Sequence, residues 1–259
     1  MLSIASSAVT HPGLVRKTNQ DSVLVTERLV AVADGLGGHA AGEVASRIAV
    51  ERMNDLAELP DASPDDVLAA IADANALICS HAEAHPGRAG MGTTLCGVGI
   101  VSVGPEEHCV VFNVGDSRVY SFRDGLLTQV SVDHSEVQEL RAAGRISQQA
   151  ALRYPRRNVI TRSLGSVPSP TPDLWMFPPA DQERFLVCSD GLTGEVDDAT
   201  IARLLAEHAE PGPAASALLE QALAAGGRDN IAVIVVNLDA GAGPIDMDTA
   251  PRVQSAQGS

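Results

Sequence analysis

The chain has 259 residues, of which 45% are hydrophobic, 20% charged and only 3% aromatic, and its formal net charge is −15. This length and composition are typical of a globular protein with an aliphatic core, folded as one large domain or two small ones. The acidic charge argues against nucleic acid or an anionic membrane surface as a partner. Because Lys17 is the only lysine, a site for phosphate esters would have to draw its positive charge from arginines or metal ions.

In the first third of the chain, aliphatic runs predict strands and a 3.6-residue periodicity predicts helices. Ser63, Pro64 and Asp66 are typical of a helix start, as N-cap, first helical residue and capping-box acid. The expected elements are strands at residues 4–9, 22–26 and 29–33, a helix from about residue 42, and a helix from residue 63 to about residue 85.

The middle of the chain is rich in strands, and Asp124-Gly125 is a hairpin signal between the last two of them. The order of these segments predicts an antiparallel meander. Its strands are expected at residues 93–103, 108–114, 118–123 and 126–132.

The last third begins with an arginine-rich segment and a proline-dense segment that is expected to follow the surface or an edge strand. Strands and helices occur in mixed blocks without steady alternation, which favours α+β layers over a doubly wound parallel sheet. Residues 240–259 are expected to form a disordered tail. The other expected elements are helices at residues 135–143, 198–208 and 213–225, strands at 185–189 and 231–238, and the proline-dense segment at 167–179.

The cysteines are Cys79, Cys96, Cys109 and Cys188, and they form no CxxC pair. This pattern favours reduced, mostly buried thiols in a cytoplasmic protein. The residues given contain neither an apolar run of about 18 residues nor a signal-peptide pattern, so no membrane span is expected.

Five aspartates stand next to apolar runs that are expected to be strands. Asp34, Asp116 and Asp190 each follow such a run, whereas Asp21 and Asp229 come just before one. Carboxylates at rigid strand ends can converge, but gathering several of them is costly unless a cation compensates. Mg²⁺ and Mn²⁺ prefer hard oxygen ligands, and two such ions can share a hydroxide and clamp a phosphoryl group.

The same residues allow a simpler interpretation. Asp34 and Asp190 are each followed by glycine, which lets the backbone approach closely and offers a carbonyl oxygen as a ligand. However, Asp-Gly is first of all a turn dipeptide, as is expected at residues 124–125. Composition and spacing alone leave metal binding and plain turns both open.

Seven short motifs together resemble the PPM family, the type 2C metal-dependent protein serine/threonine phosphatases, in their bacterial form. They follow the family's order and cover about residues 5–238. The motifs are Gly13–Ser22, Val32–His39, Gly92–Thr94, Asn113–Arg118, Asp133–Ser135, Ser189–Leu192 and Arg228–Asn230.

The resemblance implies a central antiparallel β-sandwich flanked by helices on both faces, in α-β-β-α layers. It implies a phosphatase domain over residues 1–239, with a flap at about 133–165, that hydrolyses phosphoserine and phosphothreonine in proteins. The implied partners are phosphorylated proteins and serine/threonine kinases, and we expect a cytoplasmic monomer.

The resemblance also implies a role for each site residue. Asp34 would bridge two Mn²⁺ or Mg²⁺ ions, and the Gly35 carbonyl would bind one of them. Asp190 and Asp229 would complete one metal shell, and Asp21 would contribute through water.

Two further positions complete the implied site. Asp116 would share a third, weaker metal with Asp190, and Arg16 would hold the substrate phosphate through a forked hydrogen bond.

Two positions depart from the family pattern. Gln20 stands where many members have glutamate, which removes one water-mediated carboxylate contact to the metals. Animal members carry a histidine directly after the Asp-Gly pair, as a general acid. Here Leu36 takes that position and His39 follows three residues later, so His39 is either a proton donor or a local loop residue.

Other functions fit parts of the sequence. Residues 35–40 approach a dinucleotide-binding glycine motif, but Asp34 would face the pyrophosphate and no βαβ unit is evident. A Walker motif is excluded because no glycine precedes Lys17, and a cysteine phosphatase because no arginine stands six positions after any cysteine. A catalytically silent relative and a small-molecule phosphoesterase remain as alternatives.

Overall fold

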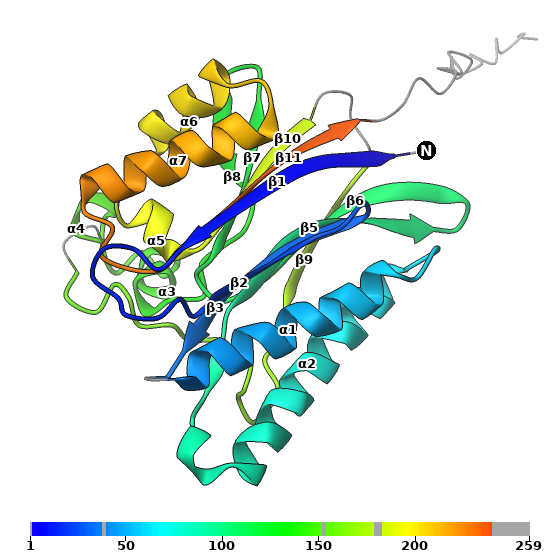
Figure 1. Cartoon of the computed structure of the whole chain (residues 1–259), viewed down its shortest axis with the longest axis vertical. Coiled ribbons are helices and arrows are strands. Elements are labelled where there is room, and N and C mark those ends of the chain that lie inside the picture. Colours follow the sequence, from blue (N-terminus) through cyan, green and yellow to red (C-terminus); the bar gives the residue numbers. More distant parts are fainter. Residues whose placement is uncertain (1, 38–39, 152–153, 179–182, 240–259) are drawn as a thin grey trace, which may run out of the picture.

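The structure is a computed structural model that describes residues 2–37, 40–151, 154–178 and 183–239. Two antiparallel sheets stack face to face, and helices cover the outer face of each (Figure 1). The expected α+β architecture in α-β-β-α layers is therefore confirmed. In the described part of the chain, no helix combines the length and the apolar character that crossing a bilayer requires.

The first sheet holds both ends of the described chain, because β1 pairs with the last strand along its whole length. Its strands, in spatial order, are β1 (Ser3–His11), β11 (Ile231–Asp239), β10 (Glu183–Cys188), β7 (Arg118–Arg123) and β8 (Leu126–Gln129).

The second sheet contains the strands that surround the expected Asp-Gly motif. Its strands, in spatial order, are β2 (Asp21–Val25), β3 (Leu29–Leu36), β5 (Leu95–Val103), β6 (Glu106–Val114) and β9 (Asp173–Phe177), and β4 (Gly92–Thr93) pairs with β3 outside this order. All three partners of β3, namely β2, β4 and β5, run antiparallel to it, so this strand is not part of the βαβ unit that dinucleotide binding needs.

The helices divide between the two outer faces and the flap. The second sheet is covered by α1 (Ala40–Ala57) and α2 (Pro64–Ala84), and a short 3₁₀ turn, η1 (Pro86–Arg88), follows α2. The first sheet is covered by α5 (Asp190–Thr193), α6 (Asp198–Glu207) and α7 (Pro211–Ala225). The segment predicted as the flap, at about residues 133–165, contains α3 (Glu136–Ala142) and α4 (Gln148–Ala151).

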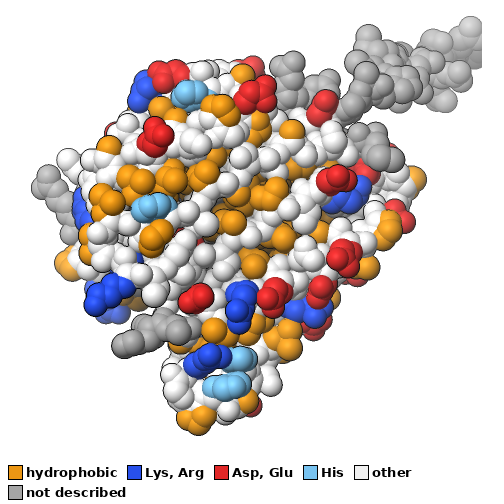
Figure 2. All heavy atoms as spheres, viewed as in Figure 1, with side chains coloured by type: hydrophobic (Ala, Val, Ile, Leu, Met, Phe, Trp, Pro, Cys, Tyr) orange, Lys and Arg blue, Asp and Glu red, His pale blue; other side chains and the backbone are white. Residues whose placement is uncertain are grey.

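Three apolar layers hold the sandwich together. Strand β3 contributes alternate residues to two of these layers. Ala31 and Ala33 pack towards α1 and α2, whereas Val30 and Val32 pack between the sheets. This use of both faces explains why β3 reads as a continuous aliphatic run. The third layer lies between the first sheet and α6 and α7. Figure 2 shows apolar side chains exposed across the middle of the viewed face, with charged side chains around them.

The helix-start prediction at Ser63 is confirmed. The Ser63 side chain accepts a hydrogen bond from the Asp66 amide, and the Asp66 carboxylate accepts one from the Ser63 amide. The Asp124-Gly125 turn is also confirmed, because both residues have positive φ angles, 52° and 79°, as a tight β-hairpin requires.

The expected four-strand meander is wrong. β5 pairs with β6 and β7 pairs with β8, but β6 and β7 lie in different sheets. The chain crosses between the sheets at Gly115, whose φ angle of 112° favours glycine. This crossing places Asp116 at one end of the sandwich.

Candidate metal centre

The structure brings five of the predicted aspartates together at one end of the sandwich. Asp21 opens β2 and faces Asp34 across the β2–β3 pair. Asp190 opens α5 directly after β10, Asp229 lies just before β11, and Asp116 lies in the crossing from β6 to β7. All four interact electrostatically with Asp34.

The placement of Asp34 differs from the expectation. It lies inside β3, and the strand continues through Gly35 and Leu36 because these residues pair with β4. Its carboxyl group lies close enough to those of Asp21 and Asp190 for their charges to act on it. Its backbone is also fixed, since the Asp34 amide donates to Thr94 Oγ1 at 2.9 Å and its carbonyl accepts from the Thr94 amide at 2.9 Å.

Burial and mutual repulsion disfavour negative charge on these carboxylates. Burial raises the pKa of Asp34 well above its ordinary value, and the charges of Asp21 and Asp190 raise it further. Burial, with the Asp190 and Asp229 charges, raises the pKa of Asp21 to about 7, although the hydrogen bond from Ser189 opposes this. Burial and the Asp190 charge raise the pKa of Asp116 to about 7.

The donor set fits a hard divalent cation. Asp21 Oδ2 accepts a hydrogen bond from Ser189 Oγ at 2.7 Å, but Asp21 Oδ1 is buried without any hydrogen-bond partner. A buried carboxylate oxygen without a partner is costly, and a cation among the surrounding carboxylates would satisfy it. As the side chains stand, no group of three or more acidic, thiol or imidazole side chains among the described residues is arranged so that it could hold a metal ion.

Arg16 lies beside the carboxylates, as predicted for a phosphate-binding arginine. Its Nε and Nη2 atoms donate to the two carboxylate oxygens of Asp229 at 2.8 and 2.7 Å. This forked contact raises the pKa of Arg16, first through the hydrogen bond and then through the charge of Asp229. The Arg16 side chain keeps 57% of its surface exposed, so the guanidinium faces the solvent side of the site.

Two polar residues that the sequence analysis did not single out hold this end of the molecule together. The Asn230 side chain accepts from the Gln20 amide and donates to the carbonyls of Pro12 and Thr18, and so fixes the loop that carries Arg16. Ser189 donates to Asp21 and accepts from the Ala232 amide. Both residues lie inside family motifs, at residues 189–192 and 228–230, and this was the only feature of the sequence that could have identified them.

Gly35 has a packing role that the sequence did not show. A Cβ atom at this position would lie 2.3 Å from the Gly42 carbonyl oxygen and 2.7 Å from the Gln20 carbonyl oxygen. Glycine therefore lets the start of α1 approach β3. His39, the candidate proton donor, lies outside the described residues.

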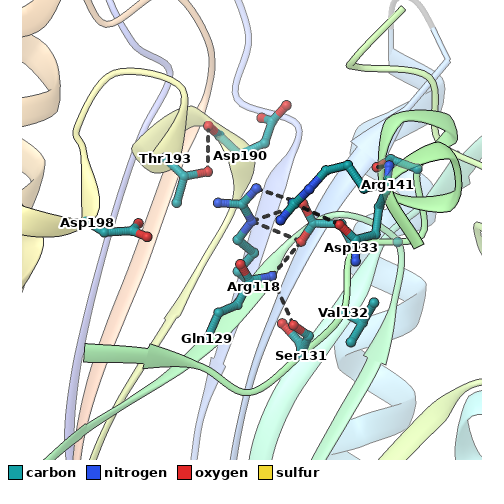
Figure 3. Close-up of polar contacts among 12 residues, drawn as sticks. Arg118, Gln129, Ser131, Val132, Asp133, Arg141, Asp190, Thr193 and Asp198 are labelled. Carbon is teal, nitrogen blue, oxygen red and sulfur yellow. Dashed lines mark hydrogen bonds and ion pairs between the residues drawn. The ribbon is translucent and has the colours of Figure 1, made fainter. Parts of the chain in front are cut away.

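A cleft of about 790 Å³ leads away from the carboxylates between the flap and the α5–α6 segment. Asp116, Asp190 and Asp229 line the cleft, and so do Arg118 and Asp133. Figure 3 shows the Arg118–Asp133 pair with Gln129 beside it and Asp190 on the α5 side. The Arg118 guanidinium contacts the Asp133 carboxylate through Nε and Nη2, the latter at 2.7 Å, and Gln129 donates to the same carboxylate at 2.8 Å.

The flap is fixed to the body at both ends. At its start, the buried His134 ring accepts from the Gly115 amide at 3.1 Å and contacts Asp173 at 3.1 Å. At its end, Asn75 of α2 accepts from the Gly165 and Ser166 amides. Because His134 bonds to the residue before Asp116, the base of the flap is joined directly to the carboxylate cluster.

Comparisons with known proteins agree with this arrangement. The sequence profile described as "Protein phosphatase 2C" matches residues 15–225. The chain is 42% identical over 243 residues to the serine/threonine protein phosphatase PstP of Mycobacterium tuberculosis, covering 92% of this chain and 45% of that protein. It is 34% identical to the serine/threonine phosphatase stp of Listeria monocytogenes, covering 89% of this chain and 94% of that protein.

A solved structure is similar over the same region. The catalytic domain of PstP, crystallised with two manganese ions, superimposes with a TM-score of 0.83 at 38% identity, covering 92% of this chain and all of that domain. The chain therefore spans less than half the length of the PstP relative, but nearly all of its catalytic domain and of the Listeria relative.

Proposed function

This chain belongs to the protein phosphatase 2C family, and from that premise we propose that it hydrolyses phosphoserine and phosphothreonine esters in proteins. The observation that carries the proposal is the carboxylate cluster around Asp34, because the pKa values of its buried members are raised and two of these, Asp116 and Asp190, line one end of the cleft. Buried carboxylates that repel one another destabilise the fold, and bound divalent cations would offset this repulsion while they take part in catalysis.

In this proposal Asp34 and the Gly35 carbonyl would hold Mn²⁺ or Mg²⁺, Asp190 and Asp229 would complete the shell of one ion, and Asp21 would contribute through water. Such ions supply an activated water and offset negative charge on the phosphoryl oxygens. Asp116 would share a third ion with Asp190.

Arg16 binds and orients the phosphoryl group. Its guanidinium already presents two donors to the Asp229 carboxylate, and the same fork matches two phosphoryl oxygens. Its exposure lets a phosphorylated side chain reach it from solvent. Ser189 and Asn230 position the site, because Ser189 joins Asp21 to the Ala232 amide and Asn230 holds the loop that carries Arg16.

Residues 1–239 would form the phosphatase domain, acting as a monomer on phosphorylated proteins and opposing serine/threonine kinases. The free thiols of Cys79, Cys96, Cys109 and Cys188 suit the reducing cytoplasm.

The test is turnover of a phosphothreonine peptide and of para-nitrophenyl phosphate, each with Mn²⁺ and with a chelator. We expect hydrolysis of both substrates with Mn²⁺ only, and a loss of at least about 100-fold in kcat for Asp34→Ala and Asp190→Ala. Near wild-type rates in chelator would refute the proposal. Hydrolysis of the small ester alone would indicate a small-molecule phosphoesterase, and no turnover at all would indicate a catalytically silent relative.

A further inference from the structure

The two walls of the cleft beside the carboxylates carry opposite charge. Arg141 and Arg157 stand on the flap wall. Glu195, Asp197 and Asp198 stand on the facing α5–α6 wall. A bound polypeptide would therefore meet positive groups on one side and negative groups on the other.

Arg141 and Arg157 differ from the other cleft arginines because no carboxylate among the described residues pairs with them. Arg118 is paired with Asp133 at 2.7 Å, and Arg228 with Glu195 at 3.0 Å. In contrast, Arg141 donates only to the neutral Gln138 side chain, at 3.0 Å. The Arg157 guanidinium has no hydrogen bond or ion pair within the described parts of the chain.

The aspartates of the acidic wall are held in place by hydrogen bonds within the fold. Asp197 caps α6 by accepting from the Thr200 amide at 2.8 Å. Asp198 accepts a hydrogen bond from the Tyr120 hydroxyl. These acids are held in place, so they repel an acidic ligand side chain and direct it towards the flap.

We propose that Arg141 and Arg157 make the enzyme prefer phosphopeptides that carry an acidic side chain close to the phosphorylated residue. The cleft is continuous with Asp116, Asp190 and Asp229, so a chain whose phosphoryl group reaches these residues runs on between the two walls. Arg141 extends from α3 towards the middle of this cleft (Figure 3). This preference rests on the proposed phosphatase function and specifies which phosphopeptides are its substrates.

Because the net charge of the chain is −15, only local positive charge such as that of Arg141 and Arg157 can attract an acidic peptide. An acidic peptide is repelled by the molecule as a whole, so any preference for it has to come from unpaired cations beside the site. Because both arginines are exposed, each contact is worth little alone, and together they give a preference of about three- to tenfold in kcat/KM that weakens with salt.

The experiment compares phosphothreonine peptides of equal length that carry two aspartates, two asparagines or two lysines, placed before or after the phosphoresidue. The full chain with Mn²⁺ is assayed as wild type, Arg141→Gln/Arg157→Gln and Arg141→Glu/Arg157→Glu. Arg145→Gln is the matched control, because Arg145 is an exposed flap arginine that does not line the cleft.

We expect wild type and Arg145→Gln to prefer the aspartate peptide on at least one side over the asparagine peptide. The ratio of the two kcat/KM values should fall to about one in the Gln variant and reverse in favour of lysine in the Glu variant. Equal wild-type rates on aspartate and asparagine peptides, a preference that survives both substitutions, or its loss in Arg145→Gln would overturn the assignment. If no peptide is hydrolysed with Mn²⁺, the proposed function itself fails, which is a different outcome from hydrolysis without preference.

Discussion

Asp34 interacts with every other carboxylate of the cluster, and each interaction raises its pKa in addition to the larger effect of burial. Replacing it with asparagine keeps the size and removes the charge. We expect Asp34→Asn to stabilise the metal-free protein at pH 8 by about 1–3 kcal/mol while abolishing Mn²⁺-dependent hydrolysis. Chemical denaturation in chelator measures the first effect, and turnover with Mn²⁺ measures the second.

Asp61→Asn is the control for this comparison, because Asp61 is exposed and lies outside the cleft. It should change the free energy of unfolding by less than about 0.5 kcal/mol. A metal-free Asp34→Asn protein that is no more stable than wild type would show that repulsion at Asp34 is already relieved within the fold.

Arg16 allows a second prediction at the scale of one residue. Its forked contact with Asp229 shows that two parallel donors are available at the edge of the site. Arg16→Ala should lower kcat/KM by about 10- to 100-fold, mainly through KM, and Arg16→Lys should recover only part of the loss because a lysine cannot fork. Steady-state kinetics with a phosphopeptide test this, and a Lys variant equal to wild type would contradict the forked role.

At the scale of elements, a buried arginine from the neighbouring sheet donates hydrogen bonds to the C-terminal end of α6. Arg184 of β10 is 8% exposed, and its guanidinium donates to the carbonyls of Leu205, His208 and Ala209 at 2.7, 2.7 and 2.9 Å. These bonds satisfy carbonyls at a helix end that would otherwise be orphaned. Arg184→Met should therefore reduce the free energy of unfolding by about 2–4 kcal/mol, measured in denaturant.

The matched control is Arg203→Gln. Arg203 lies within α6 itself and makes only an exposed pair with Glu207, so its loss should cost less than about 1 kcal/mol. If both variants lose the same small amount, the buried carbonyl contacts of Arg184 contribute no more than a surface ion pair.

Periodicity and end signals predicted most elements, including the capped start of α2 and the turn at Asp124-Gly125. They failed where the outcome depends on tertiary contacts. The strands β6 and β7 alternate like any neighbouring pair, and the pattern contains nothing that shows Gly115 sending the chain to the other sheet. The single-turn α5 is too short for periodicity, so the sequence predicts no helix at Asp190-Gly191.

At the scale of the whole molecule, the candidate residues can be predicted from the sequence, but the place where they meet cannot. Asp21 and Asp34 face each other only because β2 and β3 pair in one register, and Asp190 and Asp229 arrive from the other sheet. Roles for single residues came from motif resemblance. The contact of Arg16 with Asp229, the bond from Ser189 to Asp21 and the cleft beside them are products of the fold.

The carboxylate cluster also sets how the whole molecule responds to pH. The pKa values of Asp21 and Asp116 are raised to about 7, so the folded state holds protons that the unfolded state releases at its ordinary carboxyl pKa of about 4. The stability of the metal-free protein is therefore highest below about pH 4 with respect to these groups, and falls as the pH rises from about 4 to about 7.

Mn²⁺ should reverse this loss, because it binds the charged carboxylates and competes with their protons. We expect saturating Mn²⁺ to raise the melting temperature strongly at pH 8, where a concentration of about 100 Kd adds about 2.7 kcal/mol, and only weakly at pH 5. Thermal melts across this pH range, with Mn²⁺ or with chelator, provide the measurement. Equal shifts at pH 5 and pH 8 would mean that the ion binds somewhere other than these carboxylates, whereas a shift that grows with pH and disappears in Asp34→Asn would place the ion among them.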